Sequence, residues 1–182
     1  MISLLSKFLF ESFDISFPQN HETKKYLNSL GVKKIKFLGN LKFSESKTQK
    51  NSALNKNIEK IFKSRKIWCA VSTHNGEEKI SAEAHQKLKK KYKKLLTVII
   101  PRHVHRVNDI YKEILDMGFK VQIHSKKIKI KKDTDIYLVD TYGETKSFFK
   151  ICNTVFLGGS IVNHGGQNPL EPARFGCKIL HG

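Results

Sequence analysis

TVFLGGSIVNHGGQNPLEPARFGCKILHG, residues 154–182, is the stretch that decides the fold we expect. Its apolar run, residues 155–157, has the composition of a buried strand and is broken by the glycines and serine at 158–160. After a second glycine pair, residues 168–171 read as a helix start. Asn168 is a strong cap, Pro169 suits the first helical position, and Glu171 can accept a hydrogen bond from the amide of the cap.

This order of strand, glycine-lined gap and helix predicts an anion site. The glycines let a ligand approach the backbone, and the free N–H groups and positive dipole end of the helix face the gap. Phosphate is the anion that such a site most naturally holds. Gly159, Ser160, Asn168 and Glu171 are its candidate residues, although the capping role alone also explains Glu171.

From residue 66 onward the chain alternates between apolar runs and helical periods. The runs lie at 67–71, 96–100, 119–123, 136–139, 155–157 and 178–180, with helical patterns at 77–95, 107–117, 144–152 and 169–175. This alternation predicts an α/β fold, a Rossmann-like parallel sheet with helices on both faces. Ligands of such sheets bind at the carboxyl ends of the strands.

The first third of the chain has a different pattern. A helical apolar pattern opens it, followed by a strand-like run at 13–18, a helix at 21–30 ended by Gly31, and another strand-like run at 35–38. Residues 44–57 are polar and predict a linker into a helix at 57–63. We therefore expect boundaries that divide the chain into 1–43, 44–63 and 64–182.

Composition limits the possible classes of protein. Of 182 residues, 39% are hydrophobic, which is enough for an ordinary core. The net charge of +18, from 34 Lys and Arg against 16 Asp and Glu, indicates an anionic partner or a compositional bias toward Lys and Asn. No apolar run approaches the roughly 20 residues of a membrane span, and the opening stretch lacks the basic region of a signal peptide. Three widely spaced cysteines give no disulfide framework and fit a reducing cytosol.

Polar motifs follow the first two strands. Ser72 and His74 come directly after the first strand and suit contact with polar groups of a ligand, while Glu77 and Glu78 are best explained as complementing the dipole of the next helix. Arg102 follows a proline at the end of the second strand, where its guanidinium can donate two hydrogen bonds to a phosphate. His103 and His105 could bind zinc, but no third ligand has suitable spacing, so we expect no metal.

A third motif follows the fourth strand. Asp140 could contact a ligand or cap the next helix. Gly143 and Glu144 open that helix, whose amides could hold a ligand.

Four motifs in order carry a family resemblance: WCAVSTHNGEE (68–78), VIIPRH (98–103), VDTYGE (139–144) and FLGGSIVNHGGQNPLEPA (156–173). They resemble the 3-deoxy-D-manno-octulosonic acid (Kdo) transferases of lipopolysaccharide synthesis. GNLKF (39–43) is similar to the segment that joins the two domains of those enzymes. Val104, Thr145 and Gln167 depart from the residues usual in the family.

The resemblance implies a glycosyltransferase of the two-domain GT-B type that moves Kdo from CMP-Kdo onto a lipid A precursor, lipid IVA, at the cytoplasmic face of the bacterial inner membrane. Residues 1–43 would be the end of the acceptor domain and 64–182 a donor domain that stops before its usual end. The general base would lie in an amino-terminal part, and no metal and no nucleic acid are expected. Donor binding would fall to Ser72, His74, Arg102, His103, Gly143, Glu144, Gly159, Ser160, Asn168 and Glu171.

Two other classes of function stay open at this point. Another GT-B nucleotide-sugar enzyme, such as an epimerase or a UDP-sugar transferase, would share the phosphate gap and differ in the nucleotide that it binds. A basic nucleic-acid-binding module would explain the charge, but it needs a basic stripe with interleaved exposed aromatic residues. The aromatic residues here fall mainly in strands and helix faces instead.

Overall fold

The computed structural model describes residues 4–39, 54–126 and 129–182, which belong to two compact units, 1–49 and 50–182. Most of GNLKF and the linker up to residue 53 lie outside the described residues, and the boundaries at 43 and 63 stay predictions. None of the described helices has the length and hydropathy of a membrane span.

The smaller unit contains α1 (Leu4–Glu11) and α2 (His21–Ser29). α2 begins where the Asn20 side chain accepts a hydrogen bond from the Thr23 amide at 2.7 Å. The prediction of strands at 13–18 and 35–38 was wrong, because neither segment forms a strand. One parallel bridge joins Ser16 to Ile35. The described residues of this unit offer no further strand to pair with, and an isolated pair of strands is only marginally stable.

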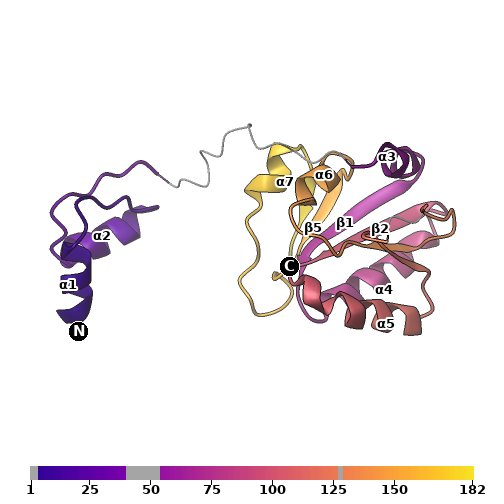
Figure 1. Ribbon diagram of the computed structural model, residues 1–182, viewed down its shortest axis with the longest axis horizontal. Coiled ribbons are helices and arrows are strands. Elements are labelled where there is room, and N and C mark those ends of the chain that lie inside the picture. Colours follow the sequence, from indigo (N-terminus) through magenta and orange to yellow (C-terminus); the bar gives the residue numbers. More distant parts are fainter. Residues whose placement is uncertain (1–3, 40–53, 127–128) are drawn as a thin grey trace. The chain divides into compact units, whose positions relative to one another are not determined.

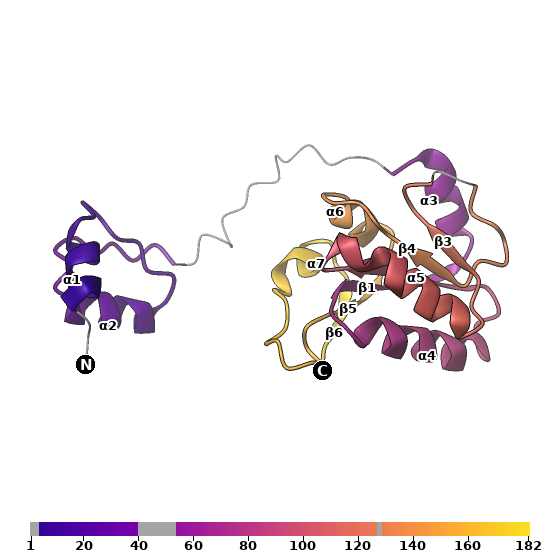
Figure 2. The ribbon, with the colours of Figure 1, turned by 60° about the horizontal axis from the view of Figure 1, so that its bottom comes forward.

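The larger unit is a six-stranded, all-parallel sheet in the order β3-β4-β2-β1-β5-β6. Figures 1 and 2 show α4 and α5 on one face of this sheet and α3 and α6 on the other. The predicted fold class is therefore confirmed. The elements in chain order are α3 (Lys56–Lys63), β1 (Lys66–Thr73), α4 (Glu77–Lys89), β2 (Leu95–Pro101), the 3₁₀ turn η2 (Val104–Arg106), α5 (Val107–Asp116), β3 (Val121–Ile123), β4 (Ile136–Leu138), α6 (Thr145–Phe149), β5 (Thr154–Leu157), α7 (Leu170–Arg174) and β6 (Lys178–Leu180).

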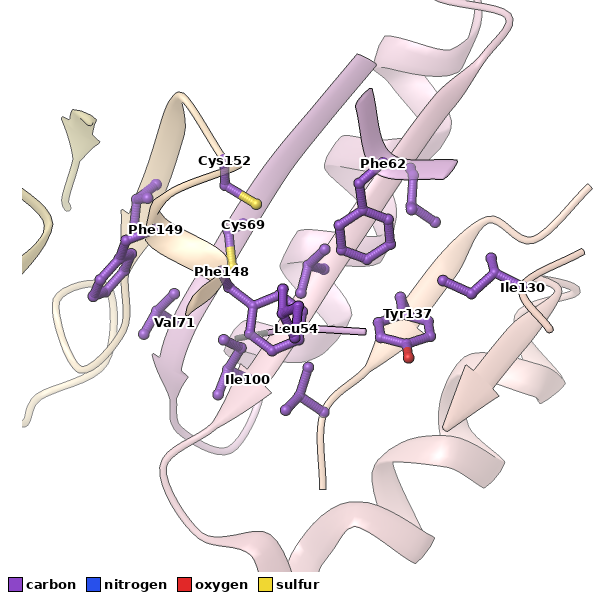
Figure 3. Packing of buried hydrophobic residues seen from close by; sticks show 14 of the residues in the cluster. Leu54, Phe62, Cys69, Val71, Ile100, Ile130, Tyr137, Phe148, Phe149 and Cys152 are labelled. Atoms are coloured by element: carbon purple, nitrogen blue, oxygen red, sulfur yellow. The ribbon is translucent and has the colours of Figure 1, made fainter. Parts of the chain in front are cut away.

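Alternate residues of the central strands supply two separate cores, because successive side chains of a strand point to opposite faces. Cys69 and Val71 of β1 pack toward α3 and α6, whereas Ala70 packs toward α4 and α5. Figure 3 shows the first core, where Phe62 of α3 meets Tyr137 of β4 edge-on with 5.4 Å between ring centroids.

The predicted helix at 77–95 is too long. α4 ends at Lys89, and Leu95 instead opens β2, where it pairs with Lys66 and is buried. The sequence pattern misled us because the lysine-rich segment before Leu95 keeps a helical period, while burial of Leu95 in the sheet decides its conformation.

Candidate functional site

The polar motifs meet where the direction of strand addition reverses. The chain passes from β1 to β2 on one side and later places β5 on the other side of β1. Open α/β sheets bind ligands at such a switch point, outside the carboxyl ends of the strands. Here the Gly158 amide donates to the Val71 carbonyl at 2.8 Å, and the Arg102 amide donates to the Thr73 carbonyl at 3.0 Å. The segments after β1, β2 and β5 therefore start side by side.

Close backbone packing explains the glycine that follows β5. A Cβ atom on Gly158 would lie 2.3 Å from the Ser72 carbonyl oxygen and 2.6 Å from the Thr73 Cα. Ser72 itself has a φ of 55°, a left-handed conformation uncommon for a residue with a side chain. This conformation coincides with a register shift between Val71 and Thr73 and turns the chain toward His74.

We expect Gly158→Ala to lower the free energy of unfolding by about 3 kcal/mol, the upper part of the range for overpacking, because the methyl group meets backbone. Gly165→Ala is the matched control, since Gly165 has open space around its Cβ position but a φ of 85°. It should lose only the about 1–2 kcal/mol of a left-handed residue. Urea unfolding of both variants measures the difference, and equal losses would contradict the close approach.

Glu77 organises the glycine loop after β5. Its side chain is fully buried, and both carboxylate oxygens accept hydrogen bonds from backbone amides. Oε2 accepts from the amides of Gly159 and His74, both at 2.8 Å, and Oε1 accepts from Ser160 and Ile161, both at 3.2 Å. Burial alone would raise the pKa of Glu77, but these amide hydrogen bonds outweigh it and hold the pKa below its usual value.

Glu78 forms the second buried contact at the start of α4. Its carboxylate accepts two hydrogen bonds from the Arg106 guanidinium, at 3.1 and 3.2 Å, and one from the Thr73 hydroxyl at 2.9 Å. Arg106 also donates to the Asn75 side chain at 3.3 Å. This bidentate pair ties the segment after β2 to the segment after β1.

Histidine rings gather beside the glycine loop. The ring centroid of His74 lies 4.0 Å from that of His164 and 5.9 Å from that of His103, which lies 5.6 Å from that of His105. Burial and the neighbouring His164 lower the pKa of His74, despite the opposing effect of Glu77. The buried Nε2 of His74 has no hydrogen-bond partner in the described part of the chain. In that same part, no three His, Cys, Asp or Glu side chains come together as metal ligands.

Arg102 is the cation that this edge leaves exposed. Its side chain has no ion pair or hydrogen bond within the described ranges, in contrast to Arg106. His103 is also exposed and lies next to it. Both residues are available to a ligand at the carboxyl edge of the sheet.

Glu144 belongs to a second polar group at the ends of β3 and β4. Its Oε2 lies 2.9 Å from His124 Nε2 and accepts a hydrogen bond from the Thr141 hydroxyl, while His124 Nδ1 lies 2.8 Å from the Tyr137 hydroxyl. Burial, with Glu144 and Asp140 nearby, raises the pKa of Tyr137. Gly143 precedes this group with a φ of 81°.

Asn168 and Glu171 behave differently from the predicted capping pair. Asn168 Oδ1 accepts a hydrogen bond from the Leu170 amide at 3.0 Å, but the N-cap of α7 is Pro169 and not Asn168. The Glu171 carboxylate, however, lies 3.6 Å from Lys146 Nζ on α6, and a bond to the Asn168 amide is not among its contacts with the described residues. The predicted hydrogen bond from the Asn168 amide to Glu171 is therefore wrong, because the carboxylate pairs with Lys146 of α6 instead.

Two of the predicted site residues, Ser160 and Glu144, line cavities, and these cavities are separate. A cavity of about 380 Å³ is lined by Ser160, residues 165–167 and Pro169, with Leu157, His181 and Gly182. A larger cavity, about 1020 Å³, lies between α3 and the ends of β3 and β4, where it is lined by Glu144, Thr141 and His124. Lys60 and Lys129 contribute positive charge to its wall.

One expectation about the glycine loop needs correction. The glycines after β5 were expected to let a ligand approach the backbone, but the amides of Gly159 and Ser160 are occupied by Glu77. α7 spans only Leu170–Arg174, and the Leu170 amide already bonds to the Asn168 side chain. The backbone of this loop thus provides less free donor capacity than the glycine pattern predicts.

The sequence analysis missed the structural importance of Glu77, Glu78 and Arg106. A pair of glutamates after a glycine turn fits the ordinary helix-dipole pattern, and nothing local distinguishes it. The partners of Glu77 lie up to 84 residues away along the chain. Only the adjacency of β1 and β5 brings them together.

Comparisons with known proteins agree with the motifs. No protein-family model matches the chain. It is 33% identical over 171 residues to the 3-deoxy-D-manno-octulosonic acid transferase of Haemophilus influenzae, and 31% identical over 180 residues to that of Aquifex aeolicus. These matches cover 92% and 99% of the chain but only 40% and 47% of the relatives. The chain therefore spans less than half the length of these curated relatives.

The fold gives the same indication. The structure is similar to the crystal structure of the C-terminal CMP-Kdo binding domain of WaaA from Acinetobacter baumannii, with a TM-score of 0.61 and 27% sequence identity. The match covers 65% of this chain and 62% of that domain. By sequence and by fold, the chain belongs to the 3-deoxy-D-manno-octulosonic acid transferase family.

Proposed function

We propose that this chain binds CMP-Kdo and contributes the donor-binding part of a glycosyltransferase that moves Kdo onto a lipid A precursor. The observation that carries the proposal is the similarity, in fold and in sequence, to a domain described as binding CMP-Kdo. The names of the curated relatives support the same reaction. The exposed Arg102 at the carboxyl edge of the sheet supplies a positive charge where a phosphate would bind.

The proposed chemistry is stabilisation of the leaving group. When the bond between Kdo and phosphate breaks, negative charge builds up on the CMP phosphate. The Arg102 guanidinium can donate two hydrogen bonds to this phosphate, with His103 beside it, so the proposed binding of the donor uses no metal. The Glu171 carboxylate is partly exposed. It can accept hydrogen bonds from the ribose hydroxyls while it also stays close to Lys146.

The proposed place of action is the cytoplasmic face of the inner membrane. Three large apolar side chains of α1, Leu4, Leu5 and Phe8, are 88%, 75% and 73% exposed. Together with the net charge of +18, such side chains suit contact with an anionic lipid surface. This contact would attach the chain to the membrane that holds a lipid acceptor.

Isothermal titration of CMP tests the donor proposal. We expect the wild-type chain to bind CMP in preference to UMP and AMP. Arg102→Ala should weaken CMP binding by about 10- to 150-fold, the equivalent of a charge-assisted hydrogen bond of about 1.5–3 kcal/mol. Lys87→Ala removes the same charge from an exposed position of α4 and serves as the control.

Two results would count against this proposal. Preference for UMP would favour another nucleotide-sugar enzyme of the same fold. Equal CMP affinity of the wild-type and Arg102→Ala chains would show that the phosphate binds elsewhere.

A further inference from the structure

We propose that Glu77 is a positioning residue whose buried carboxylate acts as a built-in anion in the glycine loop after β5 and fixes that loop for the donor. This inference rests on the proposed function, because it concerns the same site. Glu77 itself is fully buried and does not touch the ligand.

The hydrogen bonds of the Glu77 carboxylate leave neither of its oxygens free to accept from a ligand. Each carboxylate oxygen of Glu77 accepts two backbone amides, and three of the four belong to the consecutive residues 159–161. Consecutive amides that converge on one point form a concave anion site of the kind that binds phosphate in many proteins. In this chain the carboxylate of α4 occupies that site.

A phosphate of the donor must therefore be held by other groups. The amides of residues 159–161 are taken by Glu77, and Arg106 is already paired with Glu78. Arg102 is the cation at the same edge that keeps an exposed guanidinium. The loop thus contributes shape rather than charge to the site.

The fixed loop in turn shapes the smaller cavity. The Gly166 amide donates to the Gly159 carbonyl at 2.6 Å, so the second glycine pair is anchored to the residue that Glu77 holds. The Ser160 hydroxyl donates to the Leu157 carbonyl at 2.6 Å and accepts from the Gly182 amide at 3.0 Å. Ser160, Gly165 and Gly166 all line the cavity. Loss of the carboxylate would release these walls together.

Glu77→Gln tests the inference with little change in shape. One oxygen of the carboxylate becomes an NH₂ group, which is a donor and faces two backbone N–H groups that are donors as well. Those two hydrogen bonds are therefore lost. We expect amide hydrogen exchange to accelerate at least about tenfold at residues 159–161 but not in β5, and CMP affinity to fall about tenfold or more. Glu83→Gln makes the same charge change at an exposed position of α4 and should alter neither quantity.

A second measurement uses the wild-type chain and remains informative if the variant does not fold. The amide signals of His74, Gly159, Ser160 and Ile161 should shift together in NMR spectra as the pH falls below the usual range of a glutamate. The reason is that protonation of one carboxyl group weakens all four hydrogen bonds.

Three outcomes separate this inference from the proposed function. Unchanged exchange in a folded Glu77→Gln chain, or independent shifts of the four amides, would overturn the role of Glu77 in holding the loop. Faster exchange with unchanged CMP affinity would overturn its role in positioning the site. Absence of CMP binding by the wild-type chain would instead count against the proposed function, and the exchange measurement alone would then decide whether Glu77 holds the loop.

Discussion

Arg106→Ala should lower the free energy of unfolding by about 3–5 kcal/mol, the range for removing one partner of a buried ion pair. The side chain of Glu78 is fully buried, so loss of the guanidinium would leave its carboxyl group with the Thr73 hydroxyl as its remaining side-chain donor among the described residues. Urea unfolding followed by circular dichroism measures the loss. Glu83→Ala, on the exposed side of the same helix, should change stability by less than about 0.5 kcal/mol.

The two partners of this pair should not be equivalent. The Arg106 side chain keeps 21% of its surface exposed and can turn toward water when Glu78 is replaced by alanine. We therefore expect Glu78→Ala to cost less than Arg106→Ala, and the double variant to be more stable than Arg106→Ala alone. Additive losses in this cycle would contradict a direct interaction between the two charges.

Strand positions could be predicted from the sequence because the core of this sheet is apolar on both faces. Parallel strands that are covered on both faces give near-continuous apolar runs, and four of the six runs expected from residue 66 onward match the observed strands to within one residue at both ends. The exceptions are the run at 67–71, since β1 continues to Thr73, and the run at 119–123. The Phe119 amide bonds to the Ile114 carbonyl at the end of α5, which delays the start of β3 to Val121.

The site was predictable only at the level of motifs. Residues that follow strands could be assigned to the carboxyl edge, because parallel strands end on one side of the sheet. The partners of individual side chains could not be assigned, since they come from distant segments. Glu77 bonds to a loop 82–84 residues later, and Glu171 pairs with Lys146 on another helix. Local patterns predicted a glycine loop whose backbone a ligand can approach, whereas in the folded chain the amides of residues 159–161 bond to Glu77.

Phe148→Ala should also cost about 3–5 kcal/mol, the range for removing a large aromatic side chain from a core. Phe148 is fully buried, and its ring centroid lies 6.2 Å from that of Phe62 (Figure 3). The ring centroid of His124 lies 5.6 Å from that of Phe148. The neighbouring rings of Phe62 and Tyr137 belong to α3 and β4, so the cavity left by the Phe148 ring cannot close fully. Tyr142→Ala removes an aromatic side chain that is 73% exposed and is the matched control.

The same substitution links the core to the larger cavity. The His124 ring packs against Phe148 in a T-shaped arrangement, and its Nε2 contacts Glu144. Loss of the Phe148 ring therefore frees His124 to move. We expect the NMR signals of the His124 ring to shift in folded Phe148→Ala and to stay unchanged in Tyr142→Ala. A large stability loss without any change at His124 would show that the core and the polar group around Glu144 are independent.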